Sequence, residues 1–329
     1  MFLKKTFNLE HFRVNLTLFL LSLLFTGIFF YFFISLDNYL SNSIDRNAYI
    51  NAFIRGTSYF DHVENAPFIT YFTREWLWNE GVQVIVNFVG DVDLVLLMIS
   101  LCLIFIFTAF VFYNTSFIYY IFLLNPLFVD LVFSQLRIGV ALTFLLLAYF
   151  FRKKKALAFI IALMGLSIHT SSVIFVVGYV LIDYIGNVEK FKKYKVQIAI
   201  FIGFMASFMM GPLRDVILTL LNDRRVDYPD VSSGLLYMSY WVFLLGALIV
   251  NSKKINDNTL VLVGMFILSI ACFNTIFGFY SARFIAIGLP FFAYTIYHTA
   301  ISAGERFFLL LSYFGFNLVL WYYWYLALY

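Results

Sequence analysis

An arginine and a histidine lie at places in this sequence where an apolar chain rarely carries charge. Arg137 opens the stretch RIGVALTFLLLAYFFRKKK, and His169 lies within SIHTSS. Arg137 is fifteen residues from Arg152, or roughly 22 Å along a helix, and His169 follows Lys155 by fourteen residues, or roughly 21 Å. We therefore expect both side chains at one depth, inside a hydrocarbon layer about 30 Å thick. Ionisable side chains at that depth need a partner or water, so both are functional candidates, with a purely structural histidine as the alternative.

The composition indicates that the elements around these residues cross a membrane. Of 329 residues, 63% are hydrophobic and 12% are charged, and the mean hydropathy is +0.90. A soluble protein carries about 25% charged residues, and several apolar runs here approach or exceed the roughly 18–20 residues that span a bilayer. The net charge of +4 is too small to suggest a nucleic-acid partner. Cys102 and Cys272 lie in apolar runs without CxxC spacing, so we interpret both as packing residues.

We predict an all-α polytopic membrane protein in which residues 1–329 form a single transmembrane domain of about 10–11 helical segments. The predicted spans are 14–36, 91–113, 116–133, 137–151, 196–212, 234–250, 259–276, 284–298 and 307–328. The first is too long for a signal peptide and lacks a cleavage site, so we expect it to be retained. The apolar run 156–184 is interrupted at SIHTSS, and each half of about 13 residues is too short to cross. We therefore predict a broken helical hairpin with His169 at its outward tip.

The basic residues predict the orientation of these segments. With the N-terminus in the cytoplasm and the C-terminus outside, the cytoplasmic side holds 14 of the 22 basic residues, including all eleven lysines. The eight outer cations are all arginines: Arg46, Arg55, Arg74, Arg137, Arg214, Arg224, Arg225 and Arg283. The positive-inside rule explains the inner excess but not the lack of outer lysine.

Outer arginines without lysines suggest an anionic ligand. Arginine binds phosphate or carboxylate with two parallel hydrogen bonds and keeps its charge when desolvated. The alternative is that these arginines pair with outer acids such as Asp45, Glu75, Asp223 and Asp227. The sequence contains no Gly-rich phosphate loop, no HExxH, no GxSxG and no set of His, Cys and acids with metal-ligand spacing. We therefore expect no metal and no cofactor, and phosphate chemistry that depends on arginine.

Two outward loops, within 37–90 and 211–233, carry most of the outer polar residues. The first combines acids and arginines with Trp76 and Trp78. Such a mixture suits a saccharide, because sugar rings stack on aromatic faces and sugar hydroxyls bind carboxylates. The alternative is that both tryptophans belong to the interfacial aromatic belt, and residues 82–89 resemble a short interfacial segment.

The second outward loop contributes Arg214, Arg224 and Arg225 together with four aspartates. A charge cluster of this kind is usually a solvated face. Next to a membrane surface, it could also bind a lipid head group.

Five features in a fixed order resemble the EpsG family of Wzy-type O-antigen or capsular polysaccharide polymerases. They are an outer Asp-x-x-x-Tyr (Asp45, Tyr49), an acid-Gly pair closing the first loop (Glu80-Gly81), an arginine opening a span that ends in a basic run (Arg137), a histidine beside serine in a broken hairpin (His169), and a late arginine in YSARF (Arg283). The resemblance covers roughly residues 40–300. Family members usually have Gln directly after the first arginine, whereas here Gln135 precedes it.

The resemblance implies a helical fold similar to GT-C-type lipid-sugar glycosyltransferases, in the bacterial cytoplasmic membrane. It implies a metal-independent glycosyltransferase at the outer face, with undecaprenyl-pyrophosphate-linked oligosaccharides as donor and acceptor. Membrane lipid, a chain-length regulator and a flippase are further partners that it implies. Arg137 and Arg283 would bind the pyrophosphate, assisted by Arg214 or the pair Arg224-Arg225. His169, Glu80 or Asp45 would act on the acceptor hydroxyl, and Trp76, Trp78 and Tyr280 would contact the substrate.

Other classes of membrane protein stay open at this point. A membrane acyltransferase that modifies surface polysaccharide would place its catalytic histidine near the first span, where His11 lies on the cytoplasmic side and His62 is isolated in a loop. A flippase or transporter would show two related halves and ionisable residues at the midplane, and neither occurs here. A glycan ligase shares the polymerase chemistry and differs only in its acceptor.

Overall fold

The computed structural model describes residues 9–34, 43–55, 75–220, 235–255, 258–278 and 280–328. Across these ranges the chain is helical, and its one strand-like feature is an isolated antiparallel bridge between Ile255 and Thr299. The longer helices are α1 (Leu9–Ile34), α3 (Ile44–Arg55), α5 (Trp76–Val89), α6 (Val92–Asn114), α7 (Pro126–Phe133), α8 (Leu136–Phe150), α9 (Lys155–Ile168), α10 (Val173–Asn187), α11 (Lys195–Met210), α12 (Arg214–Leu220), α13 (Leu235–Val250), α14 (Thr259–Ile276), α15 (Ser281–His298) and α16 (Ala303–Leu328). The all-α prediction is confirmed for this part of the chain.

The described residues include four helical stretches that are long and apolar enough to cross a membrane. They are Asn15–Ile34 of α1, Val92–Asn114 of α6, Thr259–Ile276 of α14 and Ala303–Trp324 of α16. The pair α7 and α8 would add a fifth if it forms one span, although the two helices meet at an angle of 91°. Apolar helices of this length identify a membrane protein.

The predicted span 116–133 is wrong, because two short elements replace it. A 3-10 helix runs from Phe117 to Phe122, and α7 starts afresh at Pro126. Proline cannot donate a backbone hydrogen bond and disfavours helical geometry in the residue before it. Asn125 therefore stands outside the helix, and its side chain accepts a hydrogen bond from the N–H of Leu127 at 2.9 Å.

The interruption of the run 156–184 is confirmed, with a difference in how its halves pack. Helix α9 ends at Ile168, His169 is extended, and a 3-10 turn over Thr170–Ser172 leads into α10. Helix α9 packs along α8, whereas α10 packs against α14 and α11. The two halves therefore diverge from the break at His169, each against its own neighbour.

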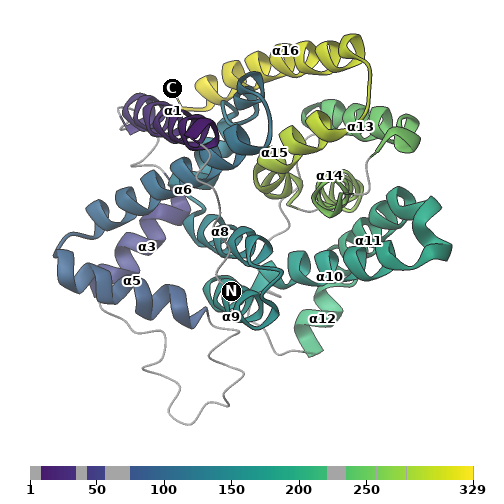
Figure 1. The fold of residues 1–329 in the computed structure, drawn as a ribbon. Coiled ribbons are helices and arrows are strands. Elements are labelled where there is room, and N and C mark those ends of the chain that lie inside the picture. Colours follow the sequence, from purple (N-terminus) through teal and green to yellow (C-terminus); the bar gives the residue numbers. More distant parts are fainter. Residues whose placement is uncertain are drawn as a thin grey trace, which may run out of the picture.

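The described part of the predicted first outward loop is mostly helical. It contains α3 and α5, so Glu80-Gly81 lies inside a helix and does not close a loop. Helix α5 packs against α9 and α6, which lie beside it in Figure 1.

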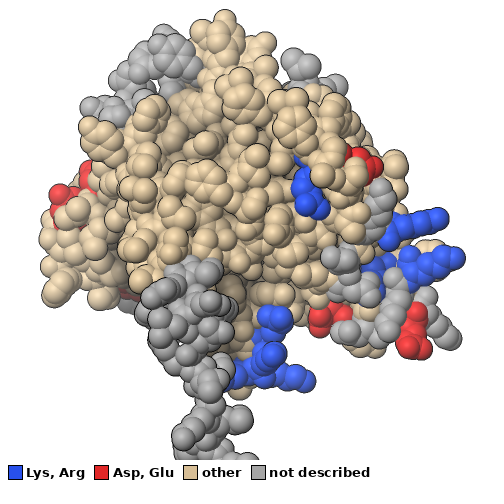
Figure 2. All heavy atoms as spheres, turned by 45° about the horizontal axis from the view of Figure 1, so that its top comes forward, with Lys and Arg blue, Asp and Glu red and all other residues tan. Residues whose placement is uncertain are grey.

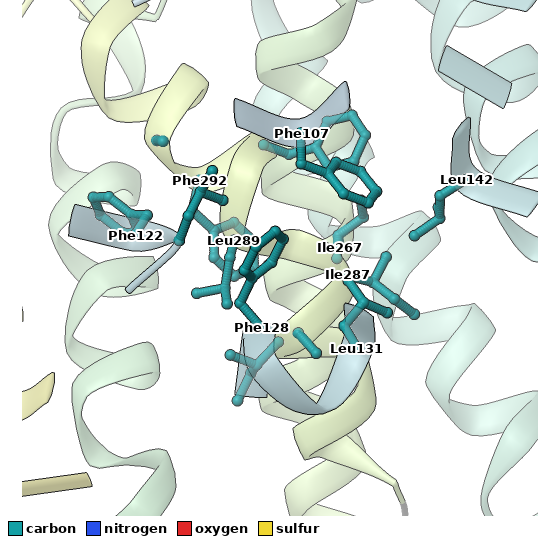
Figure 3. Close-up of a cluster of buried hydrophobic side chains, with 14 of the residues drawn as sticks. Phe107, Phe122, Phe128, Leu131, Leu142, Ile267, Ile287, Leu289 and Phe292 are labelled. Carbon is teal, nitrogen blue, oxygen red and sulfur yellow. The ribbon is translucent and has the colours of Figure 1, made fainter. Parts of the chain in front are cut away.

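The core is built around α14 and α15, which lie side by side in the middle of the molecule (Figure 1). Both are buried on nearly all sides, as expected for helices that are apolar all round. Close approach depends on glycine: a Cβ on Gly264 would lie 2.1 Å from Oγ1 of Thr295. Figure 3 shows side chains from α6, α7, α8, α14 and α15, among them Phe107, Phe128 and Leu289, meeting in one cluster.

Turns that carry basic residues contact other turns in two places. The bridge between Ile255 and Thr299, and the hydrogen bond from Thr259 to Asp183 at 3.3 Å, bring together turns that carry lysine or arginine. Two of the arginines singled out in the sequence, Arg137 and Arg283, lie near the starts of α8 and α15, as described below. In Figure 2 the visible face of the molecule carries few charged residues, and Lys and Arg lie mainly in its lower and right-hand parts. Such a face suits contact with lipid.

Candidate functional site

A carboxylate joins the two residues that stood out in the sequence. One oxygen of Glu75 accepts a hydrogen bond from Nη1 of Arg137, and the other lies 2.5 Å from Nδ1 of His169. The backbone N–H of Thr170 also points at this second oxygen, at 3.4 Å. Arg137 and His169, which were predicted to lie at one depth in the membrane, therefore meet at one acid.

Helix boundaries place all three side chains. Arg137 is the second residue of α8, His169 lies in the break between α9 and the 3-10 turn, and Glu75 immediately precedes α5. Glu75 has φ 58° and ψ 42°, the left-handed region that glycine normally occupies. An L-residue there costs about 1–2 kcal/mol, so the bonds to Arg137 and His169 must compensate for this strain. A strained non-glycine residue at a polar cluster is typical of functional sites.

Tyr49 supports Arg137 from a fourth element, α3. Nε of Arg137 donates a hydrogen bond to the Tyr49 hydroxyl at 3.1 Å, and the guanidinium carbon lies 5.2 Å from the centre of the ring. The ring of Tyr49 in turn packs edge-on against Trp78, with centroids 5.3 Å apart, and Trp78 packs against Phe53. Three residues of two helices therefore fix the position of the guanidinium.

Burial and neighbouring charges determine the ionisation states of Glu75 and Tyr49. Burial raises the pKa of Glu75, but the hydrogen bond and charge of His169 and the charge of Arg137 lower it more, so the pKa lies below its ordinary value. Burial raises the pKa of Tyr49, against the opposing charge of Arg137. Glu75 is therefore an anion and Tyr49 a neutral phenol at neutral pH. The side chains of Glu75, His169 and Arg137 are 12%, 21% and 35% exposed, so the cluster is sheltered but open to a ligand.

A second ion pair lies beside this cluster. Nη2 of Arg283, near the start of α15, lies 3.5 Å from a carboxylate oxygen of Asp45, and its guanidinium carbon lies 4.8 Å from the ring centre of Tyr280. Asp45 precedes Tyr49 by one helical turn on α3, and its charge contributes to the raised pKa of Tyr49. Helix α3 thus connects Arg283 with the cluster around Glu75.

Helix α3 is held in place by buried polar contacts. Arg46 is buried and pairs with the carboxylate of Asp93 at 3.2 Å. The hydroxyl of Ser43 donates to that of Ser134 at 2.8 Å, which ties the residue before α3 to the bend between α7 and α8. These contacts fix the face of α3 that carries Asp45 and Tyr49.

Five of the residues predicted from the sequence lie together in the structure. They are Asp45, Tyr280, Arg283, Arg137 and His169. Both arginines pair with acids, as the alternative interpretation proposed, and the pairs are themselves part of the cluster.

The other predicted residues that the structure describes are Trp76, Trp78, Glu80 and Arg214. Trp78 is only 2% exposed, so its prediction as an exposed sugar platform is wrong and it supports Tyr49 instead. Trp76 is 43% exposed. Glu80 lies one turn inside α5, and Arg214 lies 3.6 Å from Asp215, which is next to it in the chain.

The remaining predicted residues, Arg224 and Arg225, fall outside the described residues, as do Arg74 and the aspartates 223, 227 and 230.

Sequence reasoning missed Glu75 as a central residue and gave Tyr49 no role. Glu75 was considered only as one of several acids that could neutralise an arginine. The available signal was its position directly before an apolar helix that begins with Trp76, but nothing in the sequence indicates left-handed backbone at a glutamate. The part of the chain that the structure describes contains no group of three or more His, Cys, Asp or Glu able to hold a metal.

No family model, no curated protein and no solved structure matches this chain. Its activity must therefore be inferred from the geometry of the cluster and the chemistry of its residues.

Proposed function

We propose that this protein is a polysaccharide polymerase of the Wzy type, a glycosyltransferase of the bacterial cytoplasmic membrane with its site at the outer face. The donor is a glycan held at its reducing end by undecaprenyl pyrophosphate, and the acceptor is the non-reducing end of a second lipid-linked repeat unit. The observation that carries the proposal is the convergence of Arg137 and His169 on Glu75 at helix boundaries. It provides a base and an anion-binding cation within one sheltered cluster.

His169 is placed to act as the general base. Its Nδ1 faces Glu75, so the tautomer with the proton on Nδ1 donates to the carboxylate and leaves a lone pair on Nε2. Nε2 makes no hydrogen bond to any described residue. In the reaction the acceptor hydroxyl attacks the anomeric carbon of the donor, its proton passes to Nε2, and the bond from that carbon to the pyrophosphate oxygen breaks. Glu75 orients the ring and stabilises the imidazolium that forms.

Arg137 is placed to bind the leaving group. Two of its nitrogens are engaged by Tyr49 and Glu75, while Nη2 makes no hydrogen bond within the described part of the chain. A guanidinium held by two neighbours is preorganised, and negative charge on the pyrophosphate grows as the glycosidic bond breaks. Arg283, half exposed and paired with Asp45 at 3.5 Å, can exchange that carboxylate for a phosphate oxygen. Asp45 is then released to bind sugar hydroxyls.

The test is polymer formation by the purified protein in lipid vesicles supplied only with lipid-linked repeat units. A ladder of glycans on a gel supports the proposal, and the absence of any product longer than one repeat unit contradicts it. Gly246→Ala is a matched control variant, because a Cβ at Gly246 meets nothing within 4 Å. Its ladder should equal that of the wild type.

The rival classes give different results in the same system. An acyltransferase would change the acetyl content of the glycan and leave its length unchanged. A flippase would move the lipid-linked unit across the vesicle membrane without making a glycosidic bond. A ligase would transfer the glycan only when its own acceptor is added.

A further inference from the structure

We propose that one face of α5 binds the saccharide part of the substrate. This face, the polar stripe of α5, consists of Trp76, Asn79, Glu80, Gln83 and Asn87. The inference rests on the proposed function, because it assigns to the stripe the sugars that lead away from the reacting bond. The three amides were given no role by sequence, and Glu80 was considered only as a residue that acts on the acceptor hydroxyl.

Helical spacing brings the five side chains together. Residues three and four positions apart are neighbours on the surface of a helix, and each member of the stripe has such a neighbour within it. Nε2 of Gln83 donates a hydrogen bond to Oδ1 of Asn87, one turn later, at 2.9 Å. All five side chains are partly or fully exposed, and the stripe is about 16 Å long from Trp76 to Asn87. The stripe is therefore one continuous polar surface.

The other two faces of α5 determine which way the stripe points. One of them, with Trp78, Val82 and Val86, is buried against the rest of the protein. The other is apolar and exposed, since Val84 is 66% and Phe88 is 91% exposed. A helix with such a face lies in the membrane interface with that face in lipid. At the edge of the molecule, where Figure 1 shows α5, the stripe is then left to face water, on the side of the proposed reaction.

The stripe starts at the Arg137 cluster. Glu75, which joins Arg137 to His169, is followed directly by the first residue of the stripe. The first turn of α5 also packs on α3, the helix whose tyrosine bonds the same arginine. A glycan attached to the reacting sugar would therefore meet the stripe as it leaves the cluster.

The residue types of the stripe select the ligand. Each side-chain amide both donates and accepts hydrogen bonds, as sugar hydroxyls do, and the carboxylate of Glu80 accepts them. The indole of Trp76 is 43% exposed and offers an apolar surface to the C–H groups of a sugar ring. The stripe contains no lysine or arginine, and Glu80 repels phosphate, so an anionic head group does not fit. A hydroxyl-rich saccharide is the ligand that these groups suit.

The site is tested by binding of the free repeat-unit oligosaccharide, released from its lipid pyrophosphate by mild acid, to the full-length protein in nanodiscs. Titration calorimetry gives the affinity. Trp76→Ala should weaken binding about tenfold, because the aromatic platform is lost. The double variant Gln83→Ala/Asn87→Ala should weaken it about ten- to a hundredfold through the loss of several hydrogen bonds. All three positions are partly or fully exposed, so both variants should fold as the wild type does.

Phe88→Ala is the matched control for Trp76→Ala. It removes an exposed aromatic side chain from the apolar face of the same helix, so it should leave the affinity unchanged. A stripe that only faces water, or a Trp76 that only anchors α5 in the interface, predicts wild-type affinity in both stripe variants. That result, an equal loss in Phe88→Ala, or no binding by the wild type overturns the site even if polymer forms. Binding that depends on the stripe, in a protein that makes no polymer, overturns the proposed function and leaves the site standing.

Discussion

Replacing Glu75 by glutamine removes one charge and keeps the shape of the side chain. Glu75 makes two charge-assisted hydrogen bonds, each of which contributes about 1.5–3 kcal/mol when buried. The bond to Arg137 counts for less, about 1 kcal/mol, because that side chain is 35% exposed and screened by water. The sum predicts that Glu75→Gln lowers the free energy of unfolding by about 3 kcal/mol.

The effect of Glu75→Gln on activity should exceed its effect on folding. Glutamine can offer its amide N–H to Nδ1 of His169, which favours the wrong tautomer and puts the proton on Nε2. A base in the wrong tautomer loses about 10²–10⁴-fold in rate. The assay is the initial rate of glycan extension in vesicles, with thermal unfolding of the same preparation as the control for folding.

Glu75→Gly separates the role of the carboxylate from that of the backbone. Glycine adopts the left-handed conformation of residue 75 without the cost of about 1–2 kcal/mol, so part of the lost stability should return. Its rate should stay as low as that of Glu75→Gln. Near-wild-type extension by either variant, with the protein folded, would refute the role given to Glu75.

The pH dependence of stability follows from the same carboxylate. The pKa of Glu75 lies below its ordinary value of 4.5, so the folded state holds its proton less tightly than the unfolded state does. The stabilisation is therefore complete above pH 4.5 and is lost as the pH falls through the lower pKa of the folded state. The difference in Tm between wild type and Glu75→Gln should be constant above that pH and shrink below it. A difference that grows on acidification contradicts this linkage.

Three further substitutions test other parts of the account. Arg137→Lys should insert normally but extend glycans about 10²–10³-fold more slowly, because a single ammonium nitrogen lacks the planar fork that meets Tyr49, Glu75 and a phosphate from three separate nitrogens; wild-type ladders would contradict this. Trp78→Ala should cost about 3–5 kcal/mol in thermal or chemical unfolding, whereas a stable variant with altered sugar affinity would restore the exposed-platform interpretation. Gly264→Ala should cost about 1–3 kcal/mol by forcing α14 from α15, whereas Gly246→Ala should be neutral or slightly stabilising; equal Tm values would contradict the packing argument.

The sequence predicted most helices because apolar runs and basic turns are strong local signals. The boundaries of α6, α8 and α14 lie within a few residues of the predicted spans, and the break at His169 follows from a polar interruption of an apolar run. The wrong prediction of one span at 116–133 has a cause that is visible in the sequence. Asn125-Pro126 is a helix-start signal, but it lies inside an apolar stretch that hydropathy alone predicts as one span.

The site was only partly predictable, because its central contact depends on long-range packing. Arg137 and His169 could be placed at one depth by counting residues along helices. Glu75 is separated from them by 62 and 94 positions, and its left-handed backbone has no sequence signature. Trp78 was assigned to the exposed loop because α3 and α5 were not recognised as helices, so the face it buries against Tyr49 was not visible.

The release of lipid pyrophosphate per glycosidic bond tests the central claim most directly. Wild-type protein in vesicles is given repeat units with radiolabelled lipid pyrophosphate, and free label and polymer length are measured in the same sample. We predict one lipid pyrophosphate released for each bond formed, and loss of both signals together in Arg137→Lys and His169→Gln. Polymer without released lipid pyrophosphate, or release without polymer, would contradict a transferase in which Arg137 binds the leaving group and His169 takes the proton.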